Sequence, residues 1–162
     1  MFVFDNVVDH ITIEKHKATM ENHYHKMVGA GHNDQDWYPC RSVKLSTTSD
    51  IVLHVKGFLE SRIRMTTTCD DAQIQIRKDG MGGFGTHKHN HNGREHGDYN
   101  SILYLNDNFN GGEFYTETGI VIKPVVGRLT FFDGSIIEHG VKKFYGSHRY
   151  GIVFWWRDTK FY

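Results

Sequence analysis

The histidine-rich segment THKHNHNGREHGD is the part of the sequence with the clearest capacity for chemistry. The chain contains 12 histidines in 162 residues, and His87, His89, His91 and His96 all fall in this segment. Because alternate residues of a strand point to one face, an H-x-H pair places two imidazoles side by side, about 6–7 Å apart along the chain. Two neutral imidazoles in that position are suitable ligands for a first-row transition metal.

A metal site of this kind needs a third ligand from another part of the chain. His139, in the segment EHGVKK that follows the apolar run LTFF, is the best candidate. The pair from the cluster stays open at this point, because His87, His89 and His91 all lie at alternate positions. Taken alone, the cluster also fits a solvated polar loop or a tract that binds metal adventitiously.

Arg149 lies ten residues after His139 and opens the apolar segment RYGIVFWW. An arginine at the start of a buried strand needs an anionic partner or exposure at the strand end. That partner is either a carboxylate of the protein or a ligand carboxylate or phosphate bound by both arms of the guanidinium. In the second case, His139 and Arg149 frame one pocket.

Hydrophobic periodicity predicts two helices ahead of a mainly β remainder. Residues 13–28 are polar with apolar side chains at helical spacing, and we expect a surface helix that ends near Gly29 and Gly31. Asp50 is a suitable N-cap for a second helix that ends near Met65. The core-facing side of this helix is predicted to contain Ile51, Val52, Val55, Phe58, Leu59 and Ile63.

Strands are expected in the rest of the chain. Residues 32–49 are predicted to form a loop with one strand, and Ala72, Ile74 and Ile76 alternate with polar residues as in a half-buried strand. We find no repeat, linker or domain boundary, and therefore predict a single domain over residues 1–162, with two N-terminal helices followed by an antiparallel barrel or sandwich. Further strands are predicted at residues 2–4, 101–105, 112–116, 120–123, 128–132 and 149–156.

The composition limits the classes of partner. Lys and Arg number 19, as do Asp and Glu, so the net charge gives no reason to expect nucleic acid or an anionic membrane. No apolar run approaches the roughly 18 residues that a membrane span needs. Cys40 and Cys69 are too few for a disulfide framework. We therefore expect a cytoplasmic protein whose partner is neither nucleic acid nor a membrane.

Several short motifs of the second half occur together in a known family. They are Asp98-Tyr99, Leu103-Tyr104-Leu105-Asn106-Asp107, Gly111-Gly112-Glu113-Phe114, Pro124-x-x-Gly127, His139-Gly140-Val141 and Arg149. Their order and tight spacing over about residues 80–157 resemble the catalytic part of the prolyl-hydroxylase-like 2-oxoglutarate and iron(II) dioxygenases. The branch with the prolyl 3-hydroxylases and small phage and bacterial members looks most similar.

This resemblance implies a mainly β fold with a double-stranded β-helix (jelly-roll) core behind the N-terminal helices. It also implies Fe(II) as the metal, 2-oxoglutarate as cosubstrate, ascorbate as an optional reductant, and hydroxylation with release of succinate and CO2. The substrate would be a peptidyl, proline-like residue or a small molecule. By position, the family's distal iron-binding histidine is His139, the arginine that binds the far carboxylate of 2-oxoglutarate is Arg149, and the assisting tyrosine is Tyr104. Many members add a Thr or Ser four residues beyond the arginine, where this chain has Val153.

The chain departs from the family at the H-x-D-N motif. In His89-Asn90-His91-Asn92, the second asparagine matches the family's, and His91 then replaces the aspartate. This alignment predicts His89, His91 and His139 as the ligands. His87 with His89 is an alternative register.

A literal H-x-D is also present in His96-Gly97-Asp98, which makes Asp98 a further alternative ligand. Three histidines leave Fe(II) with its full charge, unlike the two-histidine, one-carboxylate site of many non-haem iron oxygenases. Anionic 2-oxoglutarate should still bind, and oxidation of the metal should be harder.

Two other functions fit parts of the sequence. Gly83, His89, His91 and Glu95 match the opening of a cupin motif, which would give a metal-dependent dioxygenase or isomerase that does not use 2-oxoglutarate. That hypothesis gives Arg149 no role. Alternatively, a catalytically impaired domain of the same fold would bind another anion in the Arg149 pocket.

Overall fold

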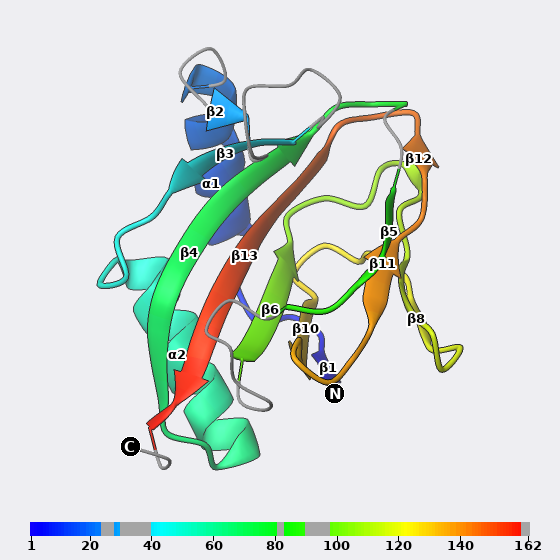
Figure 1. The fold of residues 1–162 in the computed structure, drawn as a ribbon. Coiled ribbons are helices and arrows are strands. Elements are labelled where there is room, and N and C mark those ends of the chain that lie inside the picture. The colour runs from blue at the N-terminus through cyan, green and yellow to red at the C-terminus, as the bar shows by residue number, and fades with distance from the viewer. Residues whose placement is uncertain (24–27, 30–39, 81–82, 90–97, 160–162) are drawn as a thin grey trace.

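The computed structural model describes residues 1–23, 28–29, 40–80, 83–89 and 98–159, which contain two larger antiparallel sheets, a two-stranded ribbon and two helices (Figure 1). The helices lie on one side of the larger sheet, and β5, β11 and β8 of the smaller sheet lie on the other (Figure 1). The predicted fold class, mainly β with N-terminal helices and a jelly-roll core, is confirmed.

The larger sheet has seven strands in the order β1-β10-β6-β13-β4-β3-β2, and every neighbouring pair is antiparallel. Because β1, β10, β6, β13 and β4 are neighbours in the sheet but not consecutive in the chain, the sheet brings distant segments together. Its strands in sheet order are β1 (Phe2–Phe4), β10 (Leu129–Asp133), β6 (Asp98–Tyr104), β13 (Arg149–Asp158), β4 (Thr67–Arg77), β3 (Cys40–Lys44) and β2 (Val28–Gly29).

The smaller sheet has four strands in the order β5-β11-β8-β9. They are β5 (Phe84–His87), β11 (His139–Val141), β8 (Phe114–Thr116) and β9 (Val121–Ile122). A two-stranded ribbon pairs β12 (Phe144–Tyr145) with β7 (Asn110–Gly111).

Strand alternation gives the larger sheet two faces that pack against different parts of the protein. Leu103, Ile152 and Phe154 belong to the main hydrophobic cluster, which also contains the buried residues of α1 (His10–His23) and α2 (Asp50–Ile63). Ile102 and Phe132 lie on the opposite face and pack with Phe114 of the smaller sheet and with Ile122 and Ile137. The inner face, between the sheets, is therefore the one on which a site can form.

The helix boundaries differ from the predicted ones for local reasons. α1 begins at His10 because the Asp9 carboxylate accepts a hydrogen bond from the Thr12 backbone N–H at 2.7 Å, an N-cap arrangement. The prediction that this helix extends to Val28 was wrong, since Val28 lies in β2. α2 has Ser49 rather than Asp50 as its N-cap, and it ends one residue before Arg64, which adopts a left-handed conformation with φ 52°.

The predicted core-facing side of α2 is confirmed for Ile51, Val52, Val55 and Leu59, all of which are buried. The alternation at Ala72, Ile74 and Ile76 is also confirmed, although β4 is longer than the predicted strand. The strands predicted around residues 101–105, 112–116, 120–123, 128–132 and 149–156 correspond to β6, β8, β9, β10 and β13 with shifted ends.

Candidate metal centre

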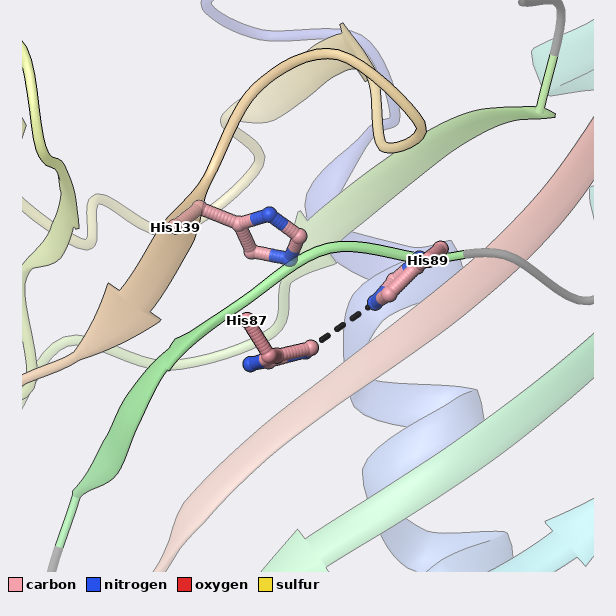
Figure 2. Close-up of side chains that lie close together, drawn as sticks. All are labelled: His87, His89 and His139. Carbon is pink, nitrogen blue, oxygen red and sulfur yellow. Dashed lines mark hydrogen bonds between the residues drawn. The ribbon is translucent and has the colours of Figure 1, made fainter. Parts of the chain in front are cut away.

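Three histidine side chains meet on the inner side of the smaller sheet. Within the described part of the chain, one ligand atom from each of His87, His89 and His139 lies within 4.8 Å of the other two. Figure 2 shows the three rings facing one another, with a hydrogen bond between His87 and His89. The two Nε2 atoms of that pair are 3.1 Å apart.

The pairing of β5 with β11 creates this arrangement. His139 lies directly opposite His87 in the register, and the pairing is irregular just beyond, between His139 and Val141. Gly83, immediately before β5, approaches the backbone of β11 so closely that a Cβ at this position would overlap the Val141 carbonyl group. A glycine is therefore required where the chain enters the site.

His139 is prepared as a neutral ligand. Its Nδ1 lies 2.8 Å from the backbone oxygen of Ile137. Because a carbonyl oxygen only accepts, Nδ1 carries the proton and Nε2 keeps a free lone pair. Burial lowers the pKa of His139 to about 4, the Ile137 hydrogen bond opposes this shift, and His89 and His87 add to it. Phe114 and Phe132 enclose the ring, with centroids 5.3 and 4.5 Å away.

His89 follows β5 and is held by residues that the sequence analysis did not identify. Its backbone N–H donates to the Gly134 carbonyl at 2.8 Å, and its Nδ1 lies 2.6 Å from the side-chain amide of Asn100. A Cβ at Gly134 would overlap the Asn100 amide and lie 2.9 Å from Nδ1 of His89. Asn100 lies on the same face of β6 as the site-facing Ile102 and Tyr104, so strand alternation could have indicated it.

These positions fit a metal ion bound by three imidazoles. Two nitrogens, each about 2.1 Å from a common ion and at a right angle to one another, lie about 3.0 Å apart. The 3.1 Å between the Nε2 atoms of His87 and His89 matches this spacing. The ligand atom of His139 is within reach of the same ion after small side-chain movements, since all three atoms lie within 4.8 Å.

An unpaired cation lies on the inner face of the larger sheet. Arg149 is only 5% exposed, and its Nε and one terminal nitrogen have no hydrogen-bond partner among the described residues. The guanidinium carbon is 5.2 Å from the centroid of the Tyr104 ring, and the Tyr104 hydroxyl is buried and equally without a partner. Leaving such groups unpaired is costly in free energy. Arg149 and Tyr104 together, called the Arg149 cradle below, therefore suit an anionic ligand.

Thr130 adds a third unpaired group to this face. It pairs with Ile102 across β10 and β6, its side chain is fully buried, and its hydroxyl has no partner within the described ranges. Val153 lies across Ile102 on the other side, in β13. A hydroxyl is thus available on β10 although residue 153 lacks one.

The structure brings together some of the predicted site residues. His89 and His139 lie in the cluster together with His87, the alternative partner, and Arg149 lies beside Tyr104. Asp98 opens β6 and is not a member of the histidine cluster. His91 and Glu95 lie outside the described residues, so their predicted roles are untested.

A model of the 2OG-Fe(II) oxygenase superfamily matches residues 72–157, which is more than half of the chain. The chain belongs to this superfamily. The match covers β4 to β13, and so it includes both the histidine cluster and the Arg149 cradle. The predicted enzyme class, with Fe(II) and 2-oxoglutarate, is confirmed, and the cupin hypothesis loses its support.

The relatives and solved structures agree with this assignment. The chain is 40% identical to prolyl 3-hydroxylase 2 of mouse and of human over 65 residues, which cover 36% of this chain and 9% of each relative. It spans less than a tenth of the length of these curated relatives.

Two solved structures show the same fold along nearly the whole chain. A prolyl hydroxylase of Trichoplax adhaerens, in complex with a hypoxia-inducible-factor peptide fragment, superposes with a TM-score of 0.73 at 18% identity and covers 98% of this chain and 84% of its own. The viral collagen prolyl hydroxylase of Paramecium bursaria chlorella virus 1 gives 0.71 at 14% identity, with 98% and 95% covered. Neither helix of the described residues is long and apolar enough to cross a membrane.

Proposed function

We propose that this chain is an iron(II)- and 2-oxoglutarate-dependent hydroxylase of a peptidyl, proline-like residue, built as a single domain over residues 1–162. The observation that supports this most directly is that a cluster of possible metal ligands and a possible anion-binding group lie on facing sheets. Three imidazoles gather on one side, and an unpaired buried guanidinium lies on the facing sheet. A dicarboxylate such as 2-oxoglutarate could bind a metal held by the imidazoles at one end and the guanidinium at the other.

In this proposal, His87, His89 and His139 hold the iron. The register with His87 is preferred over the one with His91 because His87 and His139 lie opposite each other in adjacent strands. When bound, iron and 2-oxoglutarate would supply the oxidative chemistry with dioxygen as the oxidant: one oxygen atom would enter succinate as 2-oxoglutarate loses CO2, and the other would hydroxylate the substrate. The protein supplies position and exclusion of water.

Arg149 and Tyr104 anchor the far carboxylate of 2-oxoglutarate. The Nε and a terminal nitrogen of Arg149 offer the two donors that a carboxylate accepts, and the Tyr104 hydroxyl is a third. The Thr130 hydroxyl, on the same face, would donate to the carboxylate in place of the hydroxyl that many family members have at the position of Val153. This anchor fixes the distance of the acid from the histidine cluster.

The substrate class is inferred from the relatives and from exposure. His139 is buried, whereas His87 is exposed, so the metal site is open on the β5 side. An open site suits a side chain presented by a peptide. The relatives named above are prolyl hydroxylases, and one structure contains a bound peptide fragment. The buried free thiols of Cys40 and Cys69 agree with the cytoplasmic location that we propose.

The decisive experiment begins with anaerobic titration of the purified protein with Fe(II), followed by 2-oxoglutarate. A bidentate complex gives a weak visible metal-to-ligand charge-transfer band. Oxygen is then admitted with proline-containing peptides, and succinate and hydroxylated peptide are quantified. We expect the band, succinate, and a peptide-dependent increase in succinate.

Two variants separate the proposed site from unspecific metal binding. His139→Ala removes the buried ligand and should abolish the band, whereas His23→Ala alters an exposed histidine of α1 and should leave it unchanged. Metal binding without the band would support a binding domain that does not use 2-oxoglutarate. A band without succinate would show a catalytically impaired site.

A further inference from the structure

A second arginine lies beside Arg149 on the inner face of the larger sheet. Arg77 is the last residue of β4 and pairs directly with Arg149 of β13, the neighbouring strand (Figure 1). The residues next to them, Ile76 and Tyr150, belong to the main hydrophobic cluster or pack against it, on the helix side. Because successive side chains of a strand point to opposite faces, both arginines point to the side on which the Arg149 cradle lies.

The thiol of Cys40 gives independent evidence that the two guanidinium groups are close together. Cys40 is 0% exposed and pairs with Arg77 on the other side of β4 from Arg149. Burial raises the pKa of this thiol, and the positive charges of Arg77 and then Arg149 oppose that shift. Charges shift a pKa mainly from nearby positions, so both arginines lie near one buried side chain.

The side chain of Arg77 extends along β4 toward the cradle. Its Nη2 donates to Oε1 of Gln75 at 3.3 Å. Gln75 pairs with Gly151, which pairs with Tyr104 on its other side. Apart from chain neighbours, a Cβ built at Gly151 has only the Leu103 backbone oxygen within 4 Å among the described residues, at 3.2 Å. The row from Gln75 to Tyr104 therefore leaves room for a ligand group between the two arginines and the tyrosine.

Two positive charges on directly opposed strand residues disfavour the ligand-free protein. Like charges in such pairs repel one another, and an arginine cannot lose its proton to relieve the repulsion. Arg149 also has donors that no described residue pairs. An anion on this face would offset the repulsion and accept from these donors, so a ligand group with a full negative charge gains more here than a neutral one.

We propose that Arg77 is a specificity-determining residue, which with Arg149 selects acids that carry a second negative charge at the end remote from the metal. Arg149 binds that carboxylate through hydrogen bonds, and Arg77 strengthens the binding through its charge. This inference rests on the proposed binding of 2-oxoglutarate in the Arg149 cradle.

The test compares two acids with the same metal-binding end. 2-Oxopentanoate has a methyl group where 2-oxoglutarate has its far carboxylate. The Kd of each acid is measured anaerobically with the Fe(II) protein. Arg77→Gln removes one charge, so the Kd for 2-oxoglutarate should rise about 5- to 50-fold, whereas the Kd for 2-oxopentanoate should stay within about twofold of the wild type.

Two further variants separate charge from packing. Arg77→Lys keeps the positive charge, so its Kd for 2-oxoglutarate should stay within about threefold of the wild type. Arg41→Gln is the matched control, because Arg41 is exposed and pairs with Ile76, on the opposite face of the sheet. Folding is checked by circular dichroism, and Arg77→Met takes the place of Arg77→Gln if that variant does not fold.

A role of Arg77 limited to packing predicts a different pattern. Both acids would then weaken equally in Arg77→Gln, or Arg77→Lys would lose as much affinity for 2-oxoglutarate as Arg77→Gln does. Either result overturns the inference, as does a Kd for 2-oxoglutarate that Arg77→Gln leaves unchanged while Arg149→Met raises it. Failure of the proposed function looks different: Arg149→Met would then bind 2-oxoglutarate as the wild type does, and the inference would fall with it.

Discussion

Arg149→Met tests the link between the buried guanidinium and 2-oxoglutarate. Methionine keeps an unbranched apolar stem against the Tyr104 ring and removes the donors that lack partners among the described residues. Removing one member of a buried, hydrogen-bonded charge pair costs about 2–5 kcal/mol. At about 1.4 kcal/mol per factor of ten, the Kd for 2-oxoglutarate should rise between about 30-fold and several thousand-fold.

The assay is equilibrium titration of the Fe(II) protein with 2-oxoglutarate under anaerobic conditions, followed by the charge-transfer band. Arg157→Met is the matched control, because Arg157 lies on the same strand and pairs with Asp70 at 2.7 Å, away from the cradle. Its Kd should stay within twofold of the wild type. The reasoning is refuted if Arg149→Met binds 2-oxoglutarate within threefold of the wild type while it retains its iron.

Arg149→Met also tests whether the buried guanidinium destabilises the fold of the ligand-free protein. Arg149 is buried with donors that no described residue pairs. Burial of an unpaired charge is unfavourable, so its removal should not lower the free energy of unfolding in the absence of 2-oxoglutarate. A large loss of stability would instead indicate a structural partner for the guanidinium.

Three further changes test the cradle, the core and one ion pair. Thr130→Val removes an unpaired hydroxyl, so the Kd for 2-oxoglutarate should rise about 5- to 10-fold, from about 1 kcal/mol for one hydrogen bond, without a lower melting temperature. Leu59→Ala should cost about 2–5 kcal/mol in chemical denaturation, whereas Leu53→Ala, at a half-exposed position, should cost less than about 0.5 kcal/mol. Hydrogen bonds from Arg128 lower the pKa of Asp5, and the pair should contribute about 0.2–1 kcal/mol. The stability lost in Asp5→Asn should be measurable above pH 4, and the difference from the wild type should vanish as the pH falls below that lowered pKa.

The residues of the larger sheet were largely predictable because their signals are local. Strand alternation places Ala72, Ile74 and Ile76 in the core from a few consecutive residues. The position of Arg149 at the head of an apolar run left two alternatives, burial beside an anion or exposure at the strand end, and the structure shows that Arg149 is buried. The start of α1 was predicted three residues too late because the Asp9 side chain caps the helix. Several neighbouring polar residues could serve as caps, so the sequence does not single out Asp9.

The histidine register was not predictable from spacing. His87, His89 and His91 are separated by steps of two, so every choice of pair keeps the same strand face. Within the described residues, His87 of β5 lies opposite His139 of β11, which comes from far along the chain, whereas His91 lies outside them. Long-range pairing of this kind leaves no mark in the local pattern.

The division of the site between the two sheets has a consequence for its energetics. In the proposed site, the iron ligands would come from β5, from His89 two residues beyond it and from β11, whereas the acid would be anchored from β6 and β13 of the facing sheet. A molecule of 2-oxoglutarate that contacts both must bridge the sheets, so metal and cosubstrate stabilise one arrangement together. Because each ligand then binds more tightly in the presence of the other, the coupling is reciprocal. Three neutral histidines strengthen this dependence, since the acid supplies the negative charge that the metal does not receive from the protein.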